Sequence, residues 1–188
     1  MSYSKMMVAV LTAGALIAAG CGEDDAGSAA GNEVDRAFTA EMVPHHESAV
    51  VMAKIARDRG QSRFVKALAD DIVRTQNQEI DLMRREDTEL AAAGVEKGSL
   101  GVPEHMMGMD GAPASLKAAN PFDREFIGMM LPHHEGALVM AKAELAKGES
   151  AELKALARSI LSTQQQEITA MRRHLGTDPP RQGAGRSG

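Results

Sequence analysis

The chain has 188 residues, of which 44% are hydrophobic and 25% charged, with a formal net charge of −5 at neutral pH. This balance is ordinary for a globular protein of one domain or two very small ones, and it gives no basis for a nucleic-acid partner. The 13 methionines, with no tryptophan and one tyrosine, indicate a core of aliphatic side chains and Met, which suits closely packed helices better than an aromatic-rich sheet.

Residues 1–20 have the features of a secretory signal peptide, because Lys5 precedes an apolar run that is too short for a comfortable membrane span. The small residues before Cys21 resemble a bacterial lipoprotein signal, in which this cysteine is lipidated and becomes the first mature residue. Ala18 stands where such signals more often carry Leu, so a plain signal peptide is the alternative. Cys21 is the only cysteine, which excludes an internal disulfide. We therefore expect an exported protein that is anchored to the membrane through lipid on Cys21, with a flexible tether over residues 21–31.

Residues 32–85 align with residues 120–173 without a gap, and 29 of the 54 aligned positions are identical. This is an internal duplication. In each copy a periodic apolar pattern runs from an asparagine that can cap a helix, Asn32 or Asn120, to a glycine. A serine two residues beyond that glycine can cap a second helix. Each copy therefore predicts an antiparallel helical hairpin.

Two such hairpins, related by a pseudo-twofold axis, predict an all-α four-helix bundle over residues 32–176, because a single hairpin buries little core. A Met-rich connection over residues 88–119 joins the two repeats, and residues 177–188 are expected to be a disordered tail. Two separate hairpin domains are the alternative arrangement.

The inner face of the first hairpin carries polar side chains. At about 100° per residue, Met42, His45 and His46 share the apolar stripe of one helix. Glu79 and Met83 share that of the other. Counting outward from the turn between the two helices brings these side chains to one layer, near the middle of the bundle. The same counting adds Gln76 and, in the second copy, Met130, His133, His134, Gln164, Glu167 and Met171.

A proline directly precedes each histidine pair, Pro44 in the first copy and Pro132 in the second. Neither proline can donate a hydrogen bond to the carbonyl group four residues before it, and a kink at this point is expected. We expect the kink to direct the histidines into the bundle.

Adjacent inward histidines in both repeats, beside Met and Glu, predict a metal site, because every buried polar group needs a partner. For Glu79 and Glu167 the alternative is a structural hydrogen bond to a histidine, which would equally support that histidine as a ligand. Thioethers together with imidazoles suit Cu(I).

The connection contains a second candidate metal-binding segment, EHMMGMDG, in which His105, Met106, Met107 and Met109 lie within five residues. A loop has no need of three thioethers for packing, so we expect a secondary metal-binding loop that can pass a metal on. An apolar flap over the bundle is the alternative.

The paired MVPHHESAVVMAK and MLPHHEGALVMAK segments, with the TQNQEIDLMRR and TQQQEITAMRR segments, resemble the secreted bacterial family called domain of unknown function 305. The resemblance covers residues 32–175 in two copies. It implies a ferritin-like helical bundle, and some members are implicated in periplasmic copper binding and resistance. It also implies that the four paired histidines bind metal, with Met42 and Met130 as associated thioethers.

We therefore expect an exported metal-binding protein that holds copper, as Cu(I) or Cu(II), for sequestration or for handover to a copper-handling partner protein in the cell envelope. We identify no catalytic residue and expect a binding protein rather than an enzyme. One alternative is a ferritin-like di-iron or di-manganese oxidase or peroxidase, although such sites usually need four carboxylates. Another is a metal-free envelope interaction module with structural or pH-sensing histidines.

Overall fold

The computed structural model describes residues 31–177, and all regular structure in this part of the chain is helical. Two short 3-10 helices, η1 and η2, lie in the connection between the second and third long helices. The elements are α1 (Glu33–Arg59), α2 (Arg63–Ala92), η1 (Glu104–Met106), η2 (Pro113–Ala118), α3 (Phe122–Lys147) and α4 (Ala151–Thr177).

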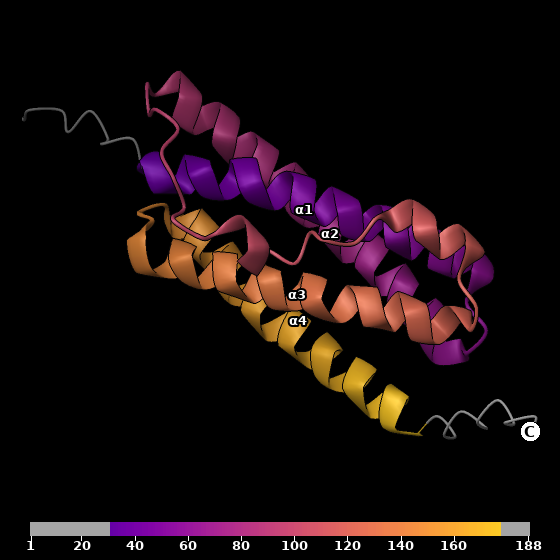
Figure 1. Cartoon of the computed structure of the whole chain (residues 1–188). Helices are drawn as coiled ribbons and strands as arrows, with labels where there is room; N and C mark the ends of the chain where they lie inside the picture. The colour runs from indigo at the N-terminus through magenta and orange to yellow at the C-terminus, as the bar shows by residue number, and fades with distance from the viewer. Residues whose placement is uncertain (1–30, 178–188) are drawn as a thin grey trace, which may run out of the picture.

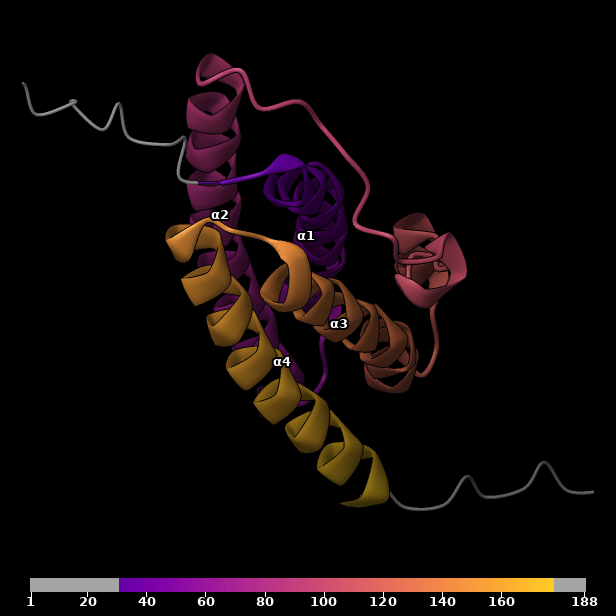
Figure 2. The same ribbon diagram turned by 90° about the vertical axis from the view of Figure 1, so that its left-hand side faces the viewer.

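The four long helices form two antiparallel hairpins, α1 with α2 and α3 with α4, and α1 packs against α3 in the opposite direction (Figure 1). α2 and α4 lie on one side of the α1–α3 pair, and the connection that carries η1 and η2 lies on the other side (Figure 2). The predicted all-α four-helix bundle is confirmed.

The signal peptide and the lipidation at Cys21 were predicted for residues outside the described range. The disordered tail was predicted for residues 177–188, of which only Thr177 is described, as the last residue of α4. None of the helices described between residues 33 and 177 is long and apolar enough to cross a membrane.

The predicted helix caps are present at three of the four helix starts. The side chain of Asn32 accepts hydrogen bonds from the first turn of α1, and Ser62 and Ser150 do the same for α2 and α4. The prediction for Asn120 is wrong: α3 begins one residue later than a cap at Asn120 requires, after Pro121, and no side chain of the described chain caps it. The peptide bond between Asn120 and Pro121 is cis.

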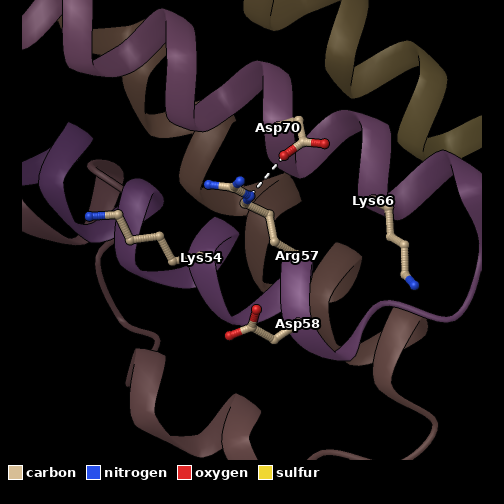
Figure 3. A pocket seen from close by; sticks show the side chains of 5 residues that line it. All are labelled: Lys54, Arg57, Asp58, Lys66 and Asp70. Carbon is tan, nitrogen blue, oxygen red and sulfur yellow. Dashed lines mark ion pairs between the residues drawn. The ribbon is translucent and has the colours of Figure 1, made fainter.

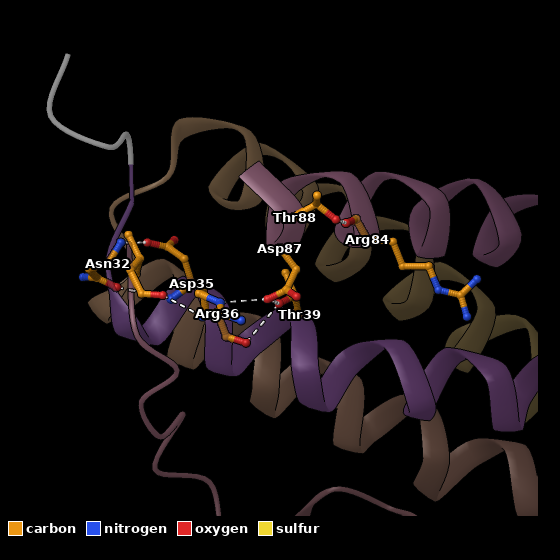
Figure 4. A network of polar contacts seen from close by, with 8 residues as sticks. Asn32, Asp35, Arg36, Thr39, Arg84, Asp87 and Thr88 are labelled. Atoms are coloured by element: carbon orange, nitrogen blue, oxygen red, sulfur yellow. Dashed lines mark hydrogen bonds and ion pairs between the residues drawn. The ribbon is translucent and has the colours of Figure 1, made fainter. Parts of the chain in front are cut away.

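Each repeat also supports a helix start in the other repeat. Asp35, in the first turn of α1, accepts hydrogen bonds of 3.0–3.1 Å from the backbone N–H groups of the turn before α4. Asp123, in the first turn of α3, accepts two bonds of 2.7 Å from the turn before α2. Figure 4 shows Asp35 beside Asn32 at this end of the bundle. These exchanged bonds hold the two hairpins in register, because the N–H groups at a helix start have no partner within the helix.

The second repeat adds a buried acid to this junction. Glu144 on α3 and Asp35 are both fully buried, and their carboxyl groups lie together beside Gly148. Burial, and then the neighbouring carboxylate of Asp35, raise the pKa of Glu144 from 4.5 to about 8. Glu144 is therefore protonated at neutral pH and donates to the Asp35 carboxylate. The equivalent position of the first repeat is Ala56, so this pair occurs at only one of the two exchanged caps.

Glu144 makes stability fall as the pH rises. Because the pKa of Glu144 is raised in the folded state, its contribution to the free energy of unfolding is complete below the unfolded-state pKa. This contribution is lost as the pH rises to the folded-state pKa of about 8. We expect urea unfolding to show that the wild type loses about 3 to 5 kcal/mol between pH 5 and 9 relative to Glu144→Gln, whose amide can donate without titrating. The effects of pH on titratable groups that both proteins contain cancel in this comparison. Parallel pH profiles for the two proteins would contradict the shared proton.

Candidate metal centre

The four paired histidines lie at the centre of the bundle, on the two helices that cross there. α1 and α3 continue through Pro44 and Pro132 as helices. His45 and His133 are each 2% exposed, and His46 and His134 are fully buried. The structure therefore places all four histidines inside, as the apolar stripe predicts.

The two histidine pairs meet across the α1–α3 contact. The rings of His45 and His133 have centroids 3.8 Å apart at an angle of 34°. Within the pairs, the centroids are 6.1 Å apart for His45 and His46 and 6.5 Å apart for His133 and His134. The half-sites of the two repeats thus form one continuous layer of imidazoles, which we call the histidine layer.

The second histidine of each pair is held by a carboxylate from the second helix of its own hairpin. Nε2 of His46 lies 2.8 Å from Oε2 of Glu79, and Nε2 of His134 lies 2.8 Å from Oε2 of Glu167. A carboxylate accepts hydrogen bonds, so each imidazole is assigned a proton on Nε2, and in the neutral tautomer with this proton Nδ1 carries the free lone pair. Neither Nδ1 has a hydrogen-bond partner among residues 31–177. Carboxylate support of one ring nitrogen, with the other free to bind, is the usual arrangement around a metal-binding histidine.

The first histidine of each pair is kept neutral. Burial, followed by the neighbouring His46 and His134, lowers the pKa of His45 from 6.5 to about 3. Burial and the adjacent imidazoles lower the pKa of His133 even further. Neutral imidazoles keep a lone pair, so at neutral pH these two rings can bind a cation without first losing a proton.

Thioethers flank the histidine layer in two separate apolar clusters, and all of them are at most 2% exposed. Met42 and Met83 of the first repeat lie in one cluster with Met140 of the second. The other cluster contains Met130 and Met171 with Met52. Each half of the core therefore contains three methionines, two from one repeat and one from the other.

The two amides that the sequence placed in the same layer, Gln76 and Gln164, are buried as well, each 3% exposed. Oε1 of Gln76 and both amide atoms of Gln164 have no hydrogen-bond partner within the described part of the chain. Yet residues 31–177 contain no group of three or more His, Cys, Asp and Glu side chains placed to hold a metal. A metal would therefore need thioether ligands or a small movement of the imidazoles toward one another.

The connection closes the face of the bundle that lies opposite α2 and α4. The carbonyl oxygen of Met107 lies 3.0 Å from Nε2 of His45 and accepts its hydrogen bond. Gly108 has a positive φ of 71° and rests on the backbone of Pro132, and Gly136 rests against Met107. A Cβ atom at either glycine would overlap with backbone, so both positions require glycine for this close approach.

The candidate loop residues divide between two environments. Met107 is half-buried against α3, whereas Met106 is 45% exposed and Met109 is 40% exposed. His105 is exposed as well. The structure thus joins the loop to the histidine layer through the backbone of Met107, and leaves two thioethers and an imidazole on the outside.

Sequence reasoning missed Glu41, which lies one helical turn before His45. Its side chain is half-buried, and Oε2 has no hydrogen-bond partner in the described chain. Burial raises the pKa of Glu41, and Lys97 and the backbone of Leu100 oppose this shift. The i, i+4 spacing from His45 was the available signal, because residues four apart lie on the same face of a helix.

In each repeat, the glutamate that follows the histidine pair forms an ion pair at the surface. Arg84 pairs with Glu47, and Arg172 pairs with Glu135, at equivalent positions of the two repeats. All four side chains are about half exposed, so these pairs contribute little to stability. Figure 4 shows Arg84 on α2 above α1.

A surface hollow of about 540 Å³ lies on the outside of α1 and α2, and none of the histidines lines it. Figure 3 shows its lining of charged side chains, among which Arg57 pairs with Asp70 at 2.8 Å. All five lining residues are exposed. Its lining mixes basic and acidic groups, so the hollow selects no ligand of one charge. The five are Lys54, Arg57, Asp58, Lys66 and Asp70.

The family model described as Domain of unknown function (DUF305) matches residues 35–175. The structure of CopM in the Cu(I)-bound form is 30% identical to the chain with a TM-score of 0.63, and that of the Cu(II)-bound form is 31% identical with a TM-score of 0.65. Both comparisons cover 76% of this chain and 95% of CopM.

Two further solved structures carry the family description. A DUF305 fragment from Deinococcus radiodurans is 34% identical, with a TM-score of 0.61 over 76% of this chain and 95% of the fragment. A DUF305 protein from Streptomyces coelicolor that is described as secreted is 29% identical, with a TM-score of 0.66 over 77% of this chain and 91% of its own. No curated protein sequence matches the chain.

Proposed function

Because the chain belongs to the DUF305 family, and because its bundle resembles that of copper-bound CopM, we propose that it binds copper at the cell envelope. Its role is sequestration or handover to another protein. One observation carries this proposal above the others: His46 and His134 are fully buried, each is held by a carboxylate at 2.8 Å, and each has an Nδ1 with no hydrogen-bond partner in the described part of the chain.

The proposed ligands for Cu(I) are imidazoles of the histidine layer together with thioethers of the flanking clusters. Both are soft enough for Cu(I), and thioethers survive outside the cytoplasm where free thiols are oxidised. Met42 and Met130 lie one turn before the histidine pairs, and Met83 and Met171 lie one turn beyond the supporting carboxylates. These four methionines are the proposed thioether donors.

Glu79 and Glu167 act in this proposal mainly through His46 and His134. Two carboxylates beside the neutral rings of His45 and His133 provide negative charge in a buried place, which offsets the cost of bringing a cation there. Cu(II) prefers harder donors, so carboxylate oxygen from these residues would join the imidazoles for that ion.

We extend the proposal to the connection as a secondary site for handover. Met106, Met109 and His105 offer soft donors on the outside of the protein, within two residues of Met107, whose carbonyl group contacts His45. The predicted signal peptide and lipid on Cys21 would place this surface at the envelope, within reach of a partner protein.

Elemental analysis of the protein purified from the cell envelope, together with a competition titration against a copper chelator, tests the proposed function. Bound copper and tight binding are expected. Stoichiometric iron or manganese would instead favour an oxidase or peroxidase, and a protein without metal that ignores added copper would favour an interaction module. Either of these results would overturn the copper proposal.

A further inference from the structure

A groove of about 320 Å³ lies between the start of α2 and the end of α4, on the side of the bundle away from the connection. Small side chains, Ala67 from α2 and Ala170 from α4, line it, and Glu167 is also in its lining. Most of its wall is apolar, and its polar side chains are Asp71, Gln166 and Glu167.

Glu167 connects this groove to the histidine layer. One of its oxygens lies 2.8 Å from Nε2 of the fully buried His134, and its side chain is 14% exposed. Glu79, which occupies the equivalent position in the first repeat, is 9% exposed and holds His46 in the same way. A single carboxylate thus touches the groove and a buried imidazole at once.

The difference between the repeats has a cause in the sequence. Ala170 is equivalent to Leu82 in the duplication. Leu82 is half-buried and packs against the apolar core of its half of the bundle. A leucine therefore occupies, in the first repeat, the position at which alanine leaves space in the second.

The opposite face of the layer is covered. Backbone of the connection lies over His45 and is packed tightly through Gly108 and Gly136 on α3. An ion that came from that face would have to displace this backbone, whereas the groove between α2 and α4 exists in the folded protein. Asp71 also lines the groove but is engaged by Arg74 at 2.6 Å on the exposed surface, which leaves Glu167 as the carboxylate available to the ion.

We propose that the groove between α2 and α4 is the passage by which Cu(I) enters and leaves the histidine layer, with Glu167 as the first protein group that it meets. This inference rests on the proposed copper binding and adds a route to it. The passage makes the two repeats unequal, because the carboxylate that lines it is the one that holds His134.

Ala170→Leu tests the passage, because it gives the second repeat the side chain that the first already has. Filling the groove should slow both entry and exit, so the rate constant for Cu(I) uptake should fall by about tenfold or more while the equilibrium Kd stays the same. Stopped-flow mixing with Cu(I) held by a weak chromophoric chelator, without oxygen, measures the rate. The Kd comes from competition titration of the same samples.

Two further variants make the test specific. Ala67→Leu fills the same groove from α2 and should also slow uptake. Leu82→Ala is the matched control in the first repeat and should not slow uptake.

If both filling variants take up Cu(I) at the wild-type rate with unchanged Kd, the passage is overturned and the copper site stands. If filling weakens the Kd but leaves the uptake rate unchanged, the effect lies in the site and the passage is again overturned. A wild-type protein that binds no Cu(I) at equilibrium overturns both proposals.

Discussion

Replacing all four paired histidines by alanine is expected to lower the affinity for Cu(I) by at least about a thousandfold. Each substitution removes an imidazole ligand from a buried site, and water is a poor substitute for imidazole as a ligand of Cu(I). Competition titration of the variant against a Cu(I) chelator measures the loss. The residual binding should be that of the exposed thioethers and imidazole of the connection, which lie outside the histidine layer.

A matched control distinguishes lost ligands from a damaged fold. Four alanines leave cavities in the core and lower stability, so circular dichroism must show that the variant is still helical. His46→Gln with His134→Gln keeps more of the side-chain volume and should still lose most of the affinity. Glu47→Gln with Glu135→Gln changes the exposed neighbours of the same histidines and should leave affinity unaltered. Wild-type affinity in the fourfold variant would show that copper binds elsewhere.

Replacing both supporting carboxylates, by Glu79→Gln and Glu167→Gln, is expected to have the next largest effect. Glutamine can still accept the hydrogen bond from each histidine, so the fold should persist. The negative charge that favours a cation is lost, and each substitution should weaken metal binding by about 10- to 100-fold. The Kd of each single variant and of the double variant for Cu(I) checks this.

The two single carboxylate variants should have similar effects on Kd, because both hydrogen bonds measure 2.8 Å. A weaker effect from one of them would indicate that its half-site contributes less to equilibrium binding. If the double variant binds Cu(I) as the wild type does, the carboxylates are purely structural, which was the alternative that the sequence left open.

Much of the fold was predictable because the same helical pattern occurs in both copies of the duplicated segment. The repeat placed a hairpin in each half, and the shared stripe of Met42, His45 and His46 correctly indicated their burial. Counting from the hairpin turn set Glu79 level with Met42, in the same layer as His46, and the structure joins Glu79 to His46 by a hydrogen bond. These inferences need only helix geometry and a turn of known position.

The features that sequence could not supply depend on where an irregular segment runs. No periodicity predicts that the carbonyl of Met107 accepts from His45, or that Gly136 is needed where the connection lies against α3. α2 continues to Ala92, beyond residue 88, where the connection was expected to begin, because the comparison of the repeats ended at residue 85. The shared proton of Asp35 and Glu144 joins elements far apart in the chain, and a pattern within one helix gives no sign of it.

Sequence also could not divide the methionines. It placed Met42 and Met130 beside the histidines, and the structure adds that they belong to two apolar clusters, each of which also contains a methionine of the other repeat. The division follows from the antiparallel crossing of α1 and α3, which brings Met140 toward the half of the core that contains Met42. Only the packing of the two hairpins decides this arrangement.

The most direct test of copper binding by these histidines is a long-range proton–nitrogen NMR spectrum of the ¹⁵N-labelled protein before and after one equivalent of Cu(I), which is diamagnetic. We expect His46 and His134 to carry their proton on Nε2 in the free protein, and we expect their Nδ1 resonances to shift when copper is added. A proton on Nδ1 of both rings, or a spectrum in which none of the four paired histidines responds to Cu(I), would contradict copper binding in the histidine layer.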